Sequence, residues 1–316
     1  MKIGLDVMGG DFAPEATIEG AVKALQNLSN GDQIVLIGDE QVIRKNLDDL
    51  GQNPDVFQII HTSQVIEMAE KPLKAISTKT DSSISVGFRL LKNRKIHAFS
   101  SAGNSGAALV GAMYSVGSIP GVIRPTTTAH IPQEKGGDAI ILDIGTNPDS
   151  RPDVLYQFAV LGSIYAKHIL NIRQPRIGLL NIGEEEGKGN LQCQSAYQLM
   201  KDSKEFSFSG NIEGRDLFKS KVDVIVCDGF TGNIVLKQIE AMYRIMQKRN
   251  LLDDYFSRFN YENYGGSPIL GVNGAAVIGH GISNAAAIKN MILLSKEIYE
   301  AKLATKIKRA LHKYTH

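Results

Sequence analysis

Residues 3–11, IGLDVMGGD, place an apolar run ahead of an aspartate, two glycines and a second aspartate, and a helical pattern follows from Pro14. Five later stretches repeat this order of apolar run, polar glycine-rich tail and helix: 98–106 (AFSSAGNSG), 140–147 (IILDIGTN), 179–190 (LLNIGEEEGKGN), 224–233 (VIVCDGFTGN) and 271–281 (GVNGAAVIGHG). In open α/β sheets, ligands bind beyond the carboxyl ends of the strands, where helix N-termini offer free N–H groups to anions. The pattern therefore predicts an anion-binding crevice, with a phosphate-like ligand as the first expectation.

Strand and helix patterns alternate along the rest of the chain. Further strands are predicted at 34–38, 56–61, 96–100, 126–131, 139–144, 177–182, 206–210 and 222–227. Helices are predicted at 14–28, 40–50, 82–93, 105–116, 151–170, 191–202 and 233–248, with one long closing helix at 284–311. Such alternation predicts an α/β fold, with a mostly parallel sheet and helices on both faces. Because no low-complexity linker or long repeat interrupts the pattern, we expect residues 1–316 to form one domain, with two lobes as a variant of it.

The composition is that of an ordinary soluble protein. Of 316 residues, 43% are hydrophobic and 22% are charged, and 35 basic side chains balance 33 acidic ones. This near-neutral balance argues against general affinity for nucleic acid. The two cysteines, Cys193 and Cys227, give no disulfide framework or zinc site and suit a reducing cytoplasm. The N-terminal residues do not resemble a signal peptide, and no apolar stretch reaches the about 18 residues that a membrane span needs.

Two segments suggest surface interactions. From about residue 234 to 262, large apolar and aromatic residues recur at helical spacing among cations, as in helices that pack on a symmetry partner or lie on a bilayer. An ordinary core-facing helix gives the same pattern. The closing helix is basic, and either faces an acidic protein or an anionic membrane or is simply solvated. Its cations are Lys296, Lys302, Lys306, Lys308, Arg309 and Lys313.

The sequence lacks the motifs of several familiar classes of enzyme and binding site. No G-x-G-x-x-G follows a strand, and 183–189 (GEEEGKG) is one residue too short for a P-loop and has no Ser or Thr after its lysine. There is no G-x-S-x-G elbow and no exposed, activated cysteine, so a covalent acyl-enzyme has no evident nucleophile. Metal ligands do not cluster, and the His312–His316 pair sits at a terminus prone to fray.

The polar residues of the loops suit an anion held by backbone N–H groups and a few lysines. Lys79, Lys188 and Lys237 are candidate cations. Ser82 and Ser83 either cap a helix or direct its N-terminus at phosphate. Asp6 and Asp11, around Gly9 and Gly10, either position substrate or form turns. His280, between two glycines, is an equally open candidate for ligand contact.

Taken together, these segments resemble the bacterial phosphate acyltransferase family of phospholipid synthesis (PlsX). The resemblance spans nearly the whole chain, and its segments are specific in this order: LDVMGGD (5–11), KTDSS (79–83), SAGNSGA (101–107), LDIGTN (142–147), YQFAVLGSIYA (156–166), LLNIGEEEGKGN (179–190), GNIEGRD (210–216), CDGFTGNIVLK (227–237), YGGSPILGVNG (264–274) and GHG (279–281).

The resemblance implies that inorganic phosphate attacks the thioester of a fatty acyl-(acyl carrier protein), releasing acyl phosphate and carrier protein. It also implies a Rossmann-like three-layer α/β/α sandwich akin to phosphotransacetylases and isocitrate dehydrogenases. No metal or other cofactor is implied. The expected assembly is a cytoplasmic homodimer that contacts the membrane peripherally through the amphipathic segment.

Within this resemblance we assign catalytic roles to Lys188, Asp228, Asn233 and His280: Lys188 balances charge on phosphate or the oxyanion, Asn233 donates, and Asp228 or His280 steers a proton to sulfur. The remaining predicted site residues bind phosphate or substrate: Asp6, Gly9, Gly10, Asp11, Lys79, Ser82, Ser83, Gly103, Asn104, Ser105, Gly106, Asn147, Gly187, Gly189, Gly229, Gly232 and Asn273. Two departures from the family stand out. One lysine stands where family members carry several cations before the serine pair, and Thr146 replaces the expected alanine.

Three rival functions fit the same loops. A phosphotransacetylase acting on acyl-coenzyme A is the first, and the basic and amphipathic segments mildly favour a carrier protein over it. An isocitrate-type dehydrogenase, the second, would need several carboxylates that bind a divalent metal. The only D-x-x-x-D pattern in this sequence is formed by Asp149 and Asp153. A non-catalytic scaffold that docks carrier protein at the membrane is the third.

Overall fold

The computed structural model describes residues 1–312, so Lys313 and His316 lie outside the described residues. The chain divides into two compact units, which we describe separately. Unit 1 comprises residues 1–118 and 261–304, and unit 2 comprises residues 119–260 and the described part of the chain from 305.

Unit 1 is built on a sheet with the strand order β3-β2-β1-β4-β11-β10. Its strands run parallel except β10, which pairs with β11 in an antiparallel hairpin. All but the edge strand β3 are short apolar runs that are largely buried, which is typical of strands covered by helices on both faces. The strands are β1 (Lys2–Asp6), β2 (Gln33–Gly38), β3 (Gln58–His61), β4 (Ala98–Ser101), β10 (Ser267–Leu270) and β11 (Ala275–Ile278).

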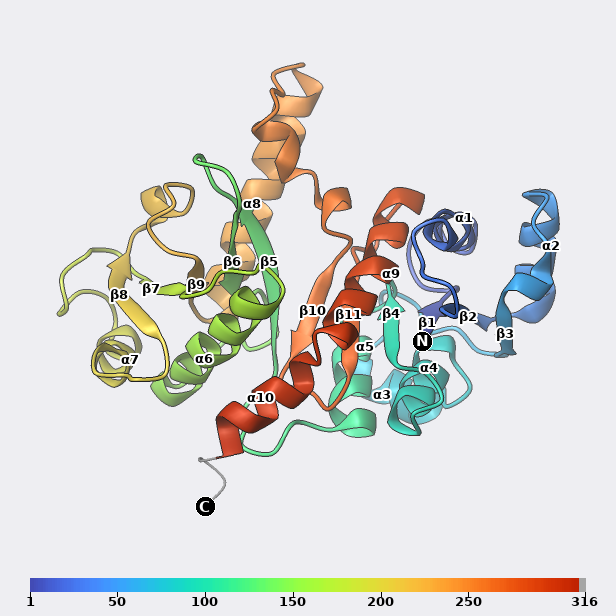
Figure 1. Ribbon diagram of the computed structural model, residues 1–316, viewed down its shortest axis with the longest axis horizontal. Helices are drawn as coiled ribbons and strands as arrows, with labels where there is room; N and C mark the ends of the chain where they lie inside the picture. Colours follow the sequence, from blue (N-terminus) through green and yellow to red (C-terminus); the bar gives the residue numbers. More distant parts are fainter. Residues whose placement is uncertain (313–316) are drawn as a thin grey trace. The chain divides into compact units, whose positions relative to one another are not determined.

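Helices cover both faces of this sheet (Figure 1). One layer consists of α1 (Glu15–Leu25) and α9 (Ala285–Glu300), which pack on each other. The opposite layer consists of α4 (Ser83–Lys92) and α5 (Ser105–Gly111), which continues as a π-helical turn through Val116. There Phe88 of α4 meets Phe99 of β4 edge to face, with ring centroids 4.9 Å apart. Helix α2 (Glu40–Asp49) extends the first layer and packs on α1, β2 and β3, whereas α3 (Pro72–Thr78) lies against α5.

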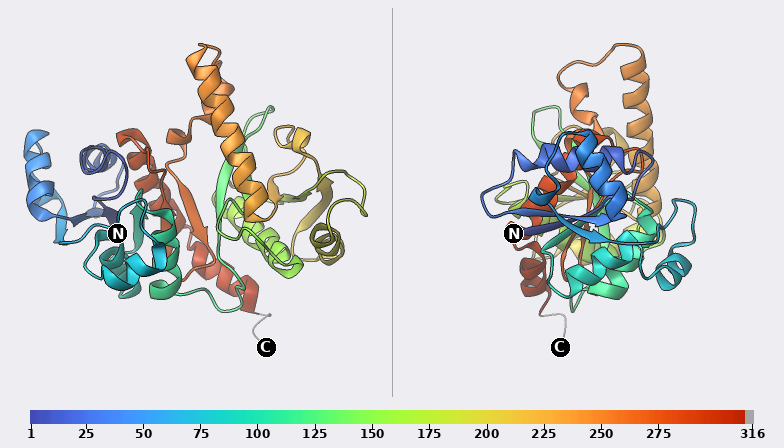
Figure 2. Two further views of the ribbon diagram at one scale, coloured as in Figure 1. Left: turned by 180° about the vertical axis from the view of Figure 1, so that it is seen from behind. Right: turned by 90° about the vertical axis from the view of Figure 1, so that its right-hand side faces the viewer.

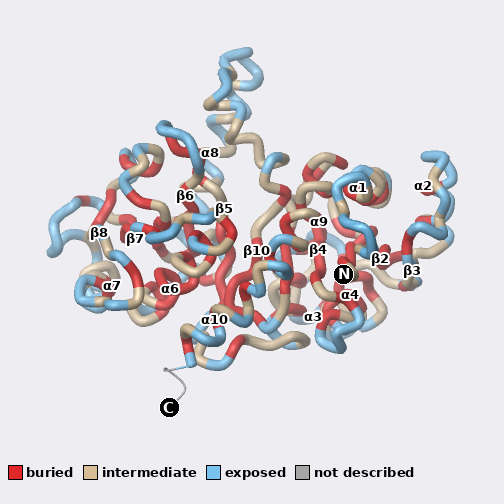
Figure 3. The backbone as a smooth tube through the Cα atoms, viewed as in Figure 1, coloured by how far each residue is buried: buried red, intermediate tan, exposed pale blue. Residues whose placement is uncertain are grey.

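Unit 2 has the strand order β5-β6-β9-β7-β8, in which β5 is antiparallel to β6 and the other pairs are parallel. The strands are β5 (Thr126–Pro132), β6 (Asp138–Leu142), β7 (Arg176–Leu180), β8 (Ser207–Ile212) and β9 (Val224–Val226). One face is covered by α6 (Pro152–His168) and α7 (Leu191–Lys201), and the other by α8 (Gly229–Lys248) through Val235 and Ile239. The inner strands β6 and β9 are buried along nearly their whole length, and buried segments are red in Figure 3.

The far half of α8 projects from the body of unit 2, as the views in Figure 2 show. After Lys248 the chain turns at Asn250, whose φ of 54° ends the helix. A short strap then returns through a 3₁₀ turn at Phe256–Phe259. Arg258 anchors this strap, because its guanidinium donates to the Gly137 carbonyl and lies 2.8 Å from an Asp138 carboxylate oxygen.

The α/β fold is as predicted, and four local features differ. The predicted closing helix at 284–311 is wrong as a single element: α9 ends at Glu300, Lys302 adopts a left-handed φ of 52°, and α10 (Leu303–Leu311) follows. The predicted amphipathic segment is α-helical only to Lys248, and short 3₁₀ turns follow it. Strand β10 and helix α3 were not predicted. Among residues 1–312, no helix is both long and apolar enough to cross a membrane.

Candidate active site

In unit 1, three glycine-rich loops meet at the carboxyl edge of the sheet. They follow β1, β4 and β11, of which β4 is the parallel neighbour of the other two. The backbone N–H of Asp11 donates to the Gly281 carbonyl at 2.7 Å. A Cβ atom on Gly9 would come within 2.7 Å of the Gly103 nitrogen, so only glycine permits this approach of the two loops. Strand order reverses between β1 and β4, which makes this the switch point where α/β proteins bind ligands.

Asp6 joins the segments that form this edge. Its side chain is fully buried and accepts hydrogen bonds from the Ser101 hydroxyl at 2.7 Å and from the Met8 N–H at 3.1 Å. Burial raises the pKa of Asp6, and hydrogen bonds from Ser83 and Ser101 oppose that rise. Asp6, which was predicted to bind substrate, is therefore enclosed by donors of the protein itself and holds the loops together.

Lys79 and Asn104, both predicted to bind phosphate, are engaged with the preceding segment. The Lys79 ammonium lies 2.5 Å from a Glu70 carboxylate oxygen and donates to the Val65 carbonyl at 2.7 Å. The hydrogen bond from Lys79 lowers the pKa of Glu70. The Asn104 amide nitrogen donates to the carbonyls of residues 67, 68 and 70, and its oxygen caps α5. These contacts fasten residues 65–79 over the loop that follows β4.

Four other predicted residues of unit 1 lie in different surroundings. Ser82 caps α4 by accepting from the Ser85 N–H, and Ser105 is exposed at the start of α5. Gly106 lies against Pro72 of α3, so a Cβ there would come 2.5 Å from the proline ring. His280 stacks on Tyr261, with ring centroids 4.9 Å apart.

Asn273 does not join these loops, which corrects its predicted place in the site. It lies in the turn between β10 and β11, and its amide nitrogen donates to the carbonyls of Gly117 and Ser118. Because β11 runs parallel to β4, the turn that precedes β11 sits at the amino edge of the sheet, opposite the glycine loops.

In unit 2, three predicted loops also meet at the carboxyl edge of the sheet. They follow the parallel neighbours β6, β9 and β7 and comprise residues 143–147, 227–233 and 181–190. Asn147 was predicted to donate to ligand, but it is 6% exposed and its amide nitrogen donates to Pro125 O at 2.8 Å and Asp143 Oδ2 at 3.0 Å. Its carbonyl accepts from the N–H of Gly229, at the start of α8. Asn147 thus fixes two of the loops to each other.

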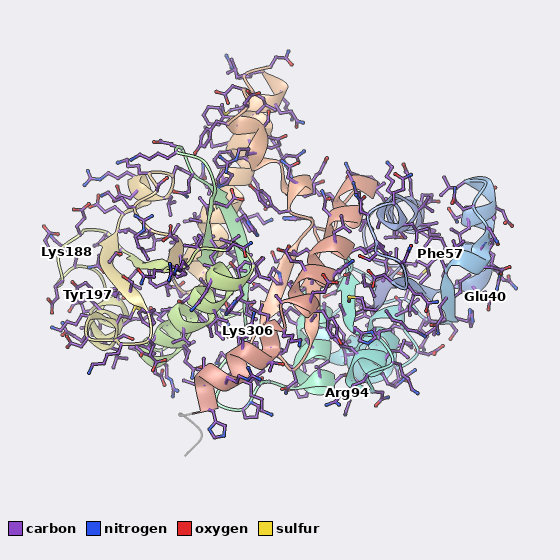
Figure 4. The ribbon with its side chains drawn as sticks, viewed as in Figure 1. Glu40, Phe57, Arg94, Lys188, Tyr197 and Lys306 are labelled. Atoms are coloured by element: carbon purple, nitrogen blue, oxygen red, sulfur yellow. The ribbon has the colours of Figure 1, made fainter. Side chains whose placement is uncertain are left out.

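Lys188 and Asn233 remain free to meet a ligand. Within residues 1–312, no hydrogen bond or ion pair engages the Lys188 ammonium or the Asn233 amide, and both side chains are exposed. Lys188 stands on the outlying loop after β7 (Figure 4), next to Gly189, whose φ of 88° is left-handed. The Asn233 side chain lies over Gly145, 3.5 Å from the position of a Cβ there.

The other predicted residues of these loops either form the start of α8 or have free space around them. Asp228 caps α8, accepting from the Thr231 N–H at 2.8 Å and from its hydroxyl at 3.1 Å. Gly229 and Gly232 are buried in the first turn of α8, whereas no atom lies within 4 Å of a Cβ placed on Gly187.

The cysteines are poor nucleophiles. Burial raises the pKa of the Cys227 thiol well above its usual value, and the Asp228 and Asp143 carboxylates add to the rise. Burial followed by the charge of Asp228 also raises the pKa of Cys193. A thiol must ionise to attack a carbonyl, so neither side chain is set up for covalent catalysis. Among residues 1–312, no group of three or more His, Cys, Asp or Glu side chains could hold a metal ion.

Comparison with known proteins decides among the functions that these loops allow. The profile of the family described as "Fatty acid synthesis protein" matches residues 1–249. The chain is 41% identical to the phosphate acyltransferase of Dictyoglomus turgidum, covering 100% of this chain and 99% of the relative. It is also 41% identical to the phosphate acyltransferase of Halothermothrix orenii, covering 99% of both. This chain belongs to the phosphate acyltransferase family. As the resemblance of its motifs predicted, it is an acyltransferase.

Solved structures show that phosphotransacetylases share its fold. EutD phosphotransacetylase from Staphylococcus aureus superposes with a TM-score of 0.61 at 17% identity, over 94% of each chain. A branched-chain phosphotransacylase from Enterococcus faecalis V583 gives a TM-score of 0.63 at 12% identity, over 95% of this chain and 99% of the other. Such distant likeness confirms the predicted phosphotransacetylase-like α/β fold of this phosphate acyltransferase family member.

Sequence reasoning missed three residues that organise the site. Ser101 and Glu70 hold Asp6 and Lys79, and Asp143 binds the backbone of its own loop. Asp143 had a signal in the sequence, because an aspartate that directly follows a buried strand and precedes a glycine often accepts N–H groups of the next turn. The partner of Ser101 lies 95 residues away, and α3, which was not predicted, separates Glu70 from its partner Lys79, so no local pattern marks either residue.

Proposed function

We propose that the protein transfers a fatty acyl group from the thioester of an acyl carrier protein to inorganic phosphate, giving acyl phosphate and free carrier protein for phospholipid synthesis. The observation that carries the proposal is full-length similarity to phosphate acyltransferases. The loop geometry supports it, since backbone N–H groups and uncommitted donors suit an anionic nucleophile.

The chemistry needs little acid or base catalysis. Phosphate is already a nucleophile at neutral pH, and a thiol with a pKa of about 8.5 leaves readily. Placement matters more, because holding two reactants in line can remove roughly 7 to 11 kcal/mol of barrier. An enzyme of this kind can therefore work without a nucleophilic side chain.

In this proposal, Lys188 supplies the positive charge and Asn233 a neutral donor at the carboxyl edge of unit 2. The Lys188 ammonium balances charge on phosphate or on the oxyanion that forms at the thioester carbonyl. One well-aimed donor to such an oxyanion contributes about 2.7 to 4 kcal/mol. The N–H groups of Gly187 and Gly189 stand beside it.

The decisive experiment incubates the purified protein with long-chain acyl-(acyl carrier protein) and inorganic phosphate, without ATP or nicotinamide. Acyl phosphate is trapped with hydroxylamine and measured by mass. We expect phosphate-dependent product that falls about 100-fold or more in Lys188→Ala, the loss typical of one oxyanion donor. The matched control is Lys167→Ala, an exposed lysine at the end of α6.

Two other outcomes would replace the proposal. If carrier protein binds without any product, the protein is a scaffold. If acyl-coenzyme A reacts and acyl carrier protein does not, it is a phosphotransacetylase of the kind whose fold it shares. Normal turnover by Lys188→Ala would refute only the role of that lysine.

We further propose that the protein is a homodimer that pairs through α8. Apart from Gly229 and Gly232, no residue of this fully described helix is buried. Val235 and Ile239 face the sheet, and a second apolar stripe faces outward, at Phe230, Ile234, Met242 and Ile245, each at least 49% exposed. An apolar stripe of this size on both sides of a helix is expected where two copies pack together.

Sedimentation velocity tests the dimer with Met242→Glu combined with Ile245→Glu. We expect the charged pair to give monomers, while Gln247→Glu, at an exposed position of α8 outside the stripe, stays dimeric. A monomeric wild-type protein, or a dimeric double variant, would contradict pairing through this stripe.

We also propose that the tip beyond α8 contacts the cytoplasmic face of the membrane. Leu251 is 55% exposed there and follows the cations Lys248 and Arg249, a combination that favours anionic bilayers. We expect flotation with phosphatidylglycerol vesicles that weakens in Leu251→Ser. The control is Leu199→Ser, an exposed leucine of α7, and equal flotation of the two variants would exclude the tip.

A further inference from the structure

Asp143 is the most heavily hydrogen-bonded buried carboxylate near the unit 2 loops. It is fully buried directly after β6. One oxygen accepts from the N–H of Ile144 at 2.7 Å and of Thr146 at 3.2 Å, with Thr127 at 3.4 Å. The other oxygen accepts from the N–H of Asn147 at 2.5 Å and from its amide nitrogen at 3.0 Å.

These contacts extend to the first turn of α8. The carbonyl of Asn147 accepts from the Gly229 N–H at 2.8 Å, and a Cβ on Gly229 would come within 2.8 Å of both Asn147 O and Asp143 Oδ2. The Asp143 backbone donates to the Cys227 carbonyl at 3.0 Å. The carboxylate therefore sits where the loop after β6 and the start of α8 touch.

Asn233 is the exposed end of this arrangement. Its side chain lies over Gly145, the residue at the centre of the Asp143 turn. Gly145 has a φ of 118°, and the loop keeps that conformation because Asp143 binds the N–H groups on both sides of it. We propose that Asp143 is a positioning residue, which holds the loop 143–147 against α8 so that Asn233 is aimed at the substrate.

Replacing Asp143 with asparagine tests the proposal sharply. Both carboxylate oxygens accept from N–H donors, so either orientation of an amide would point an NH₂ group at other donors. The loop should then shift relative to α8. Since a misplacement of about 1 Å can cost about 100-fold in rate, we expect kcat/KM for phosphate to fall about 100-fold in Asp143→Asn.

A double-mutant cycle separates positioning from a merely structural role. If Asp143 acts through Asn233, the variant that combines Asp143→Asn with Asn233→Ala should be no slower than Asn233→Ala alone. Multiplied losses in the double variant would overturn the proposal. Asp32→Asn, at a partly buried carboxylate of unit 1 that is paired with Lys296, is the control that should lower stability and leave turnover unchanged.

Hydrogen exchange gives a readout that does not depend on turnover. The proposal rests on the proposed function for its kinetic arm, but faster exchange in peptides 143–147 and 229–233 of Asp143→Asn is expected even if the substrate is misassigned. Unchanged exchange there would overturn the placement. If Asp143→Asn does not fold, Asn147→Ala breaks the same link and carries the same two measurements.

Discussion

The contact between α8 and the loop after β6 leaves no room for a side chain at Gly232. A Cβ there would lie 1.9 Å from the Asp143 carbonyl oxygen and 2.9 Å from Cys227 Sγ, whereas ordinary contacts begin at 3.4 Å. In Gly232→Ala, the start of α8 must therefore move by about 1.5 Å from the loop. Asn233, the next residue, moves with it.

This displacement predicts a large loss of rate together with a loss of stability. Overpacking costs about 1 to 3 kcal/mol, and the upper end applies here because the clashing atom is a backbone oxygen, while replacing glycine by alanine within a helix returns about 1 kcal/mol. The free energy of unfolding should therefore fall by about 2 kcal/mol, while kcat for acyl phosphate formation falls about 100-fold.

Urea unfolding and the hydroxylamine assay measure the two quantities on the same preparations. Gly214→Ala is the matched control, because no atom lies within 4 Å of a Cβ on Gly214. A folded Gly232→Ala protein with wild-type kcat would refute the reasoning that the packing of α8 on this loop sets the geometry of the site.

Three further predictions concern other contacts. Burial would raise the pKa of Asp32, but hydrogen bonds from Lys296 and the Met1 nitrogen hold it at about 2, so the ionised form stabilises the fold above pH 3.8 and this contribution is lost as the pH falls toward 2. Urea unfolding should show that Asp32→Asn lowers the free energy of unfolding by about 1 to 2 kcal/mol at pH 7, after allowance for screening. This difference from the wild-type protein should shrink as the pH falls from 3.8 toward 2, and a difference that stays constant would contradict the assignment. Arg258→Met should speed hydrogen exchange in the strap at 249–260 with little change in global stability, because Arg258 anchors only that segment, and an unchanged strap would show that its aromatic contacts suffice. Lys79→Met and Glu70→Gln should change KM for phosphate equally and slightly, since each side chain is committed to the other, whereas a large rise for the lysine variant alone would show that Lys79 meets phosphate.

Much of the fold follows from local patterns. Buried parallel strands read as short apolar runs. The residues that cap α4, α7 and α8 belong to the polar segments that were predicted to precede helices, and they are Ser82, Asn190 and Asp228. The break at Lys302 was invisible because neither glycine nor proline marks it. Helix α3 did carry a signal, a proline at its first position, but at seven residues it is too short for a periodic pattern.

The sequence by itself determined the α/β class, the family and the loops that gather at the carboxyl edges, because strand direction and glycine-rich turns are encoded locally. Only the tertiary structure decided which side chains in those loops remain free. Asn104, Asn147 and Lys79 look like ligands in the sequence, yet their donors are taken by carbonyl or carboxylate groups from other segments, while Lys188 and Asn233 stay uncommitted. Asn273 left the predicted site because β10 and β11 form a hairpin that places their turn at the other edge. Each side chain has only a few hydrogen-bond donors, and folding alone brings near the carbonyl or carboxylate groups that occupy them.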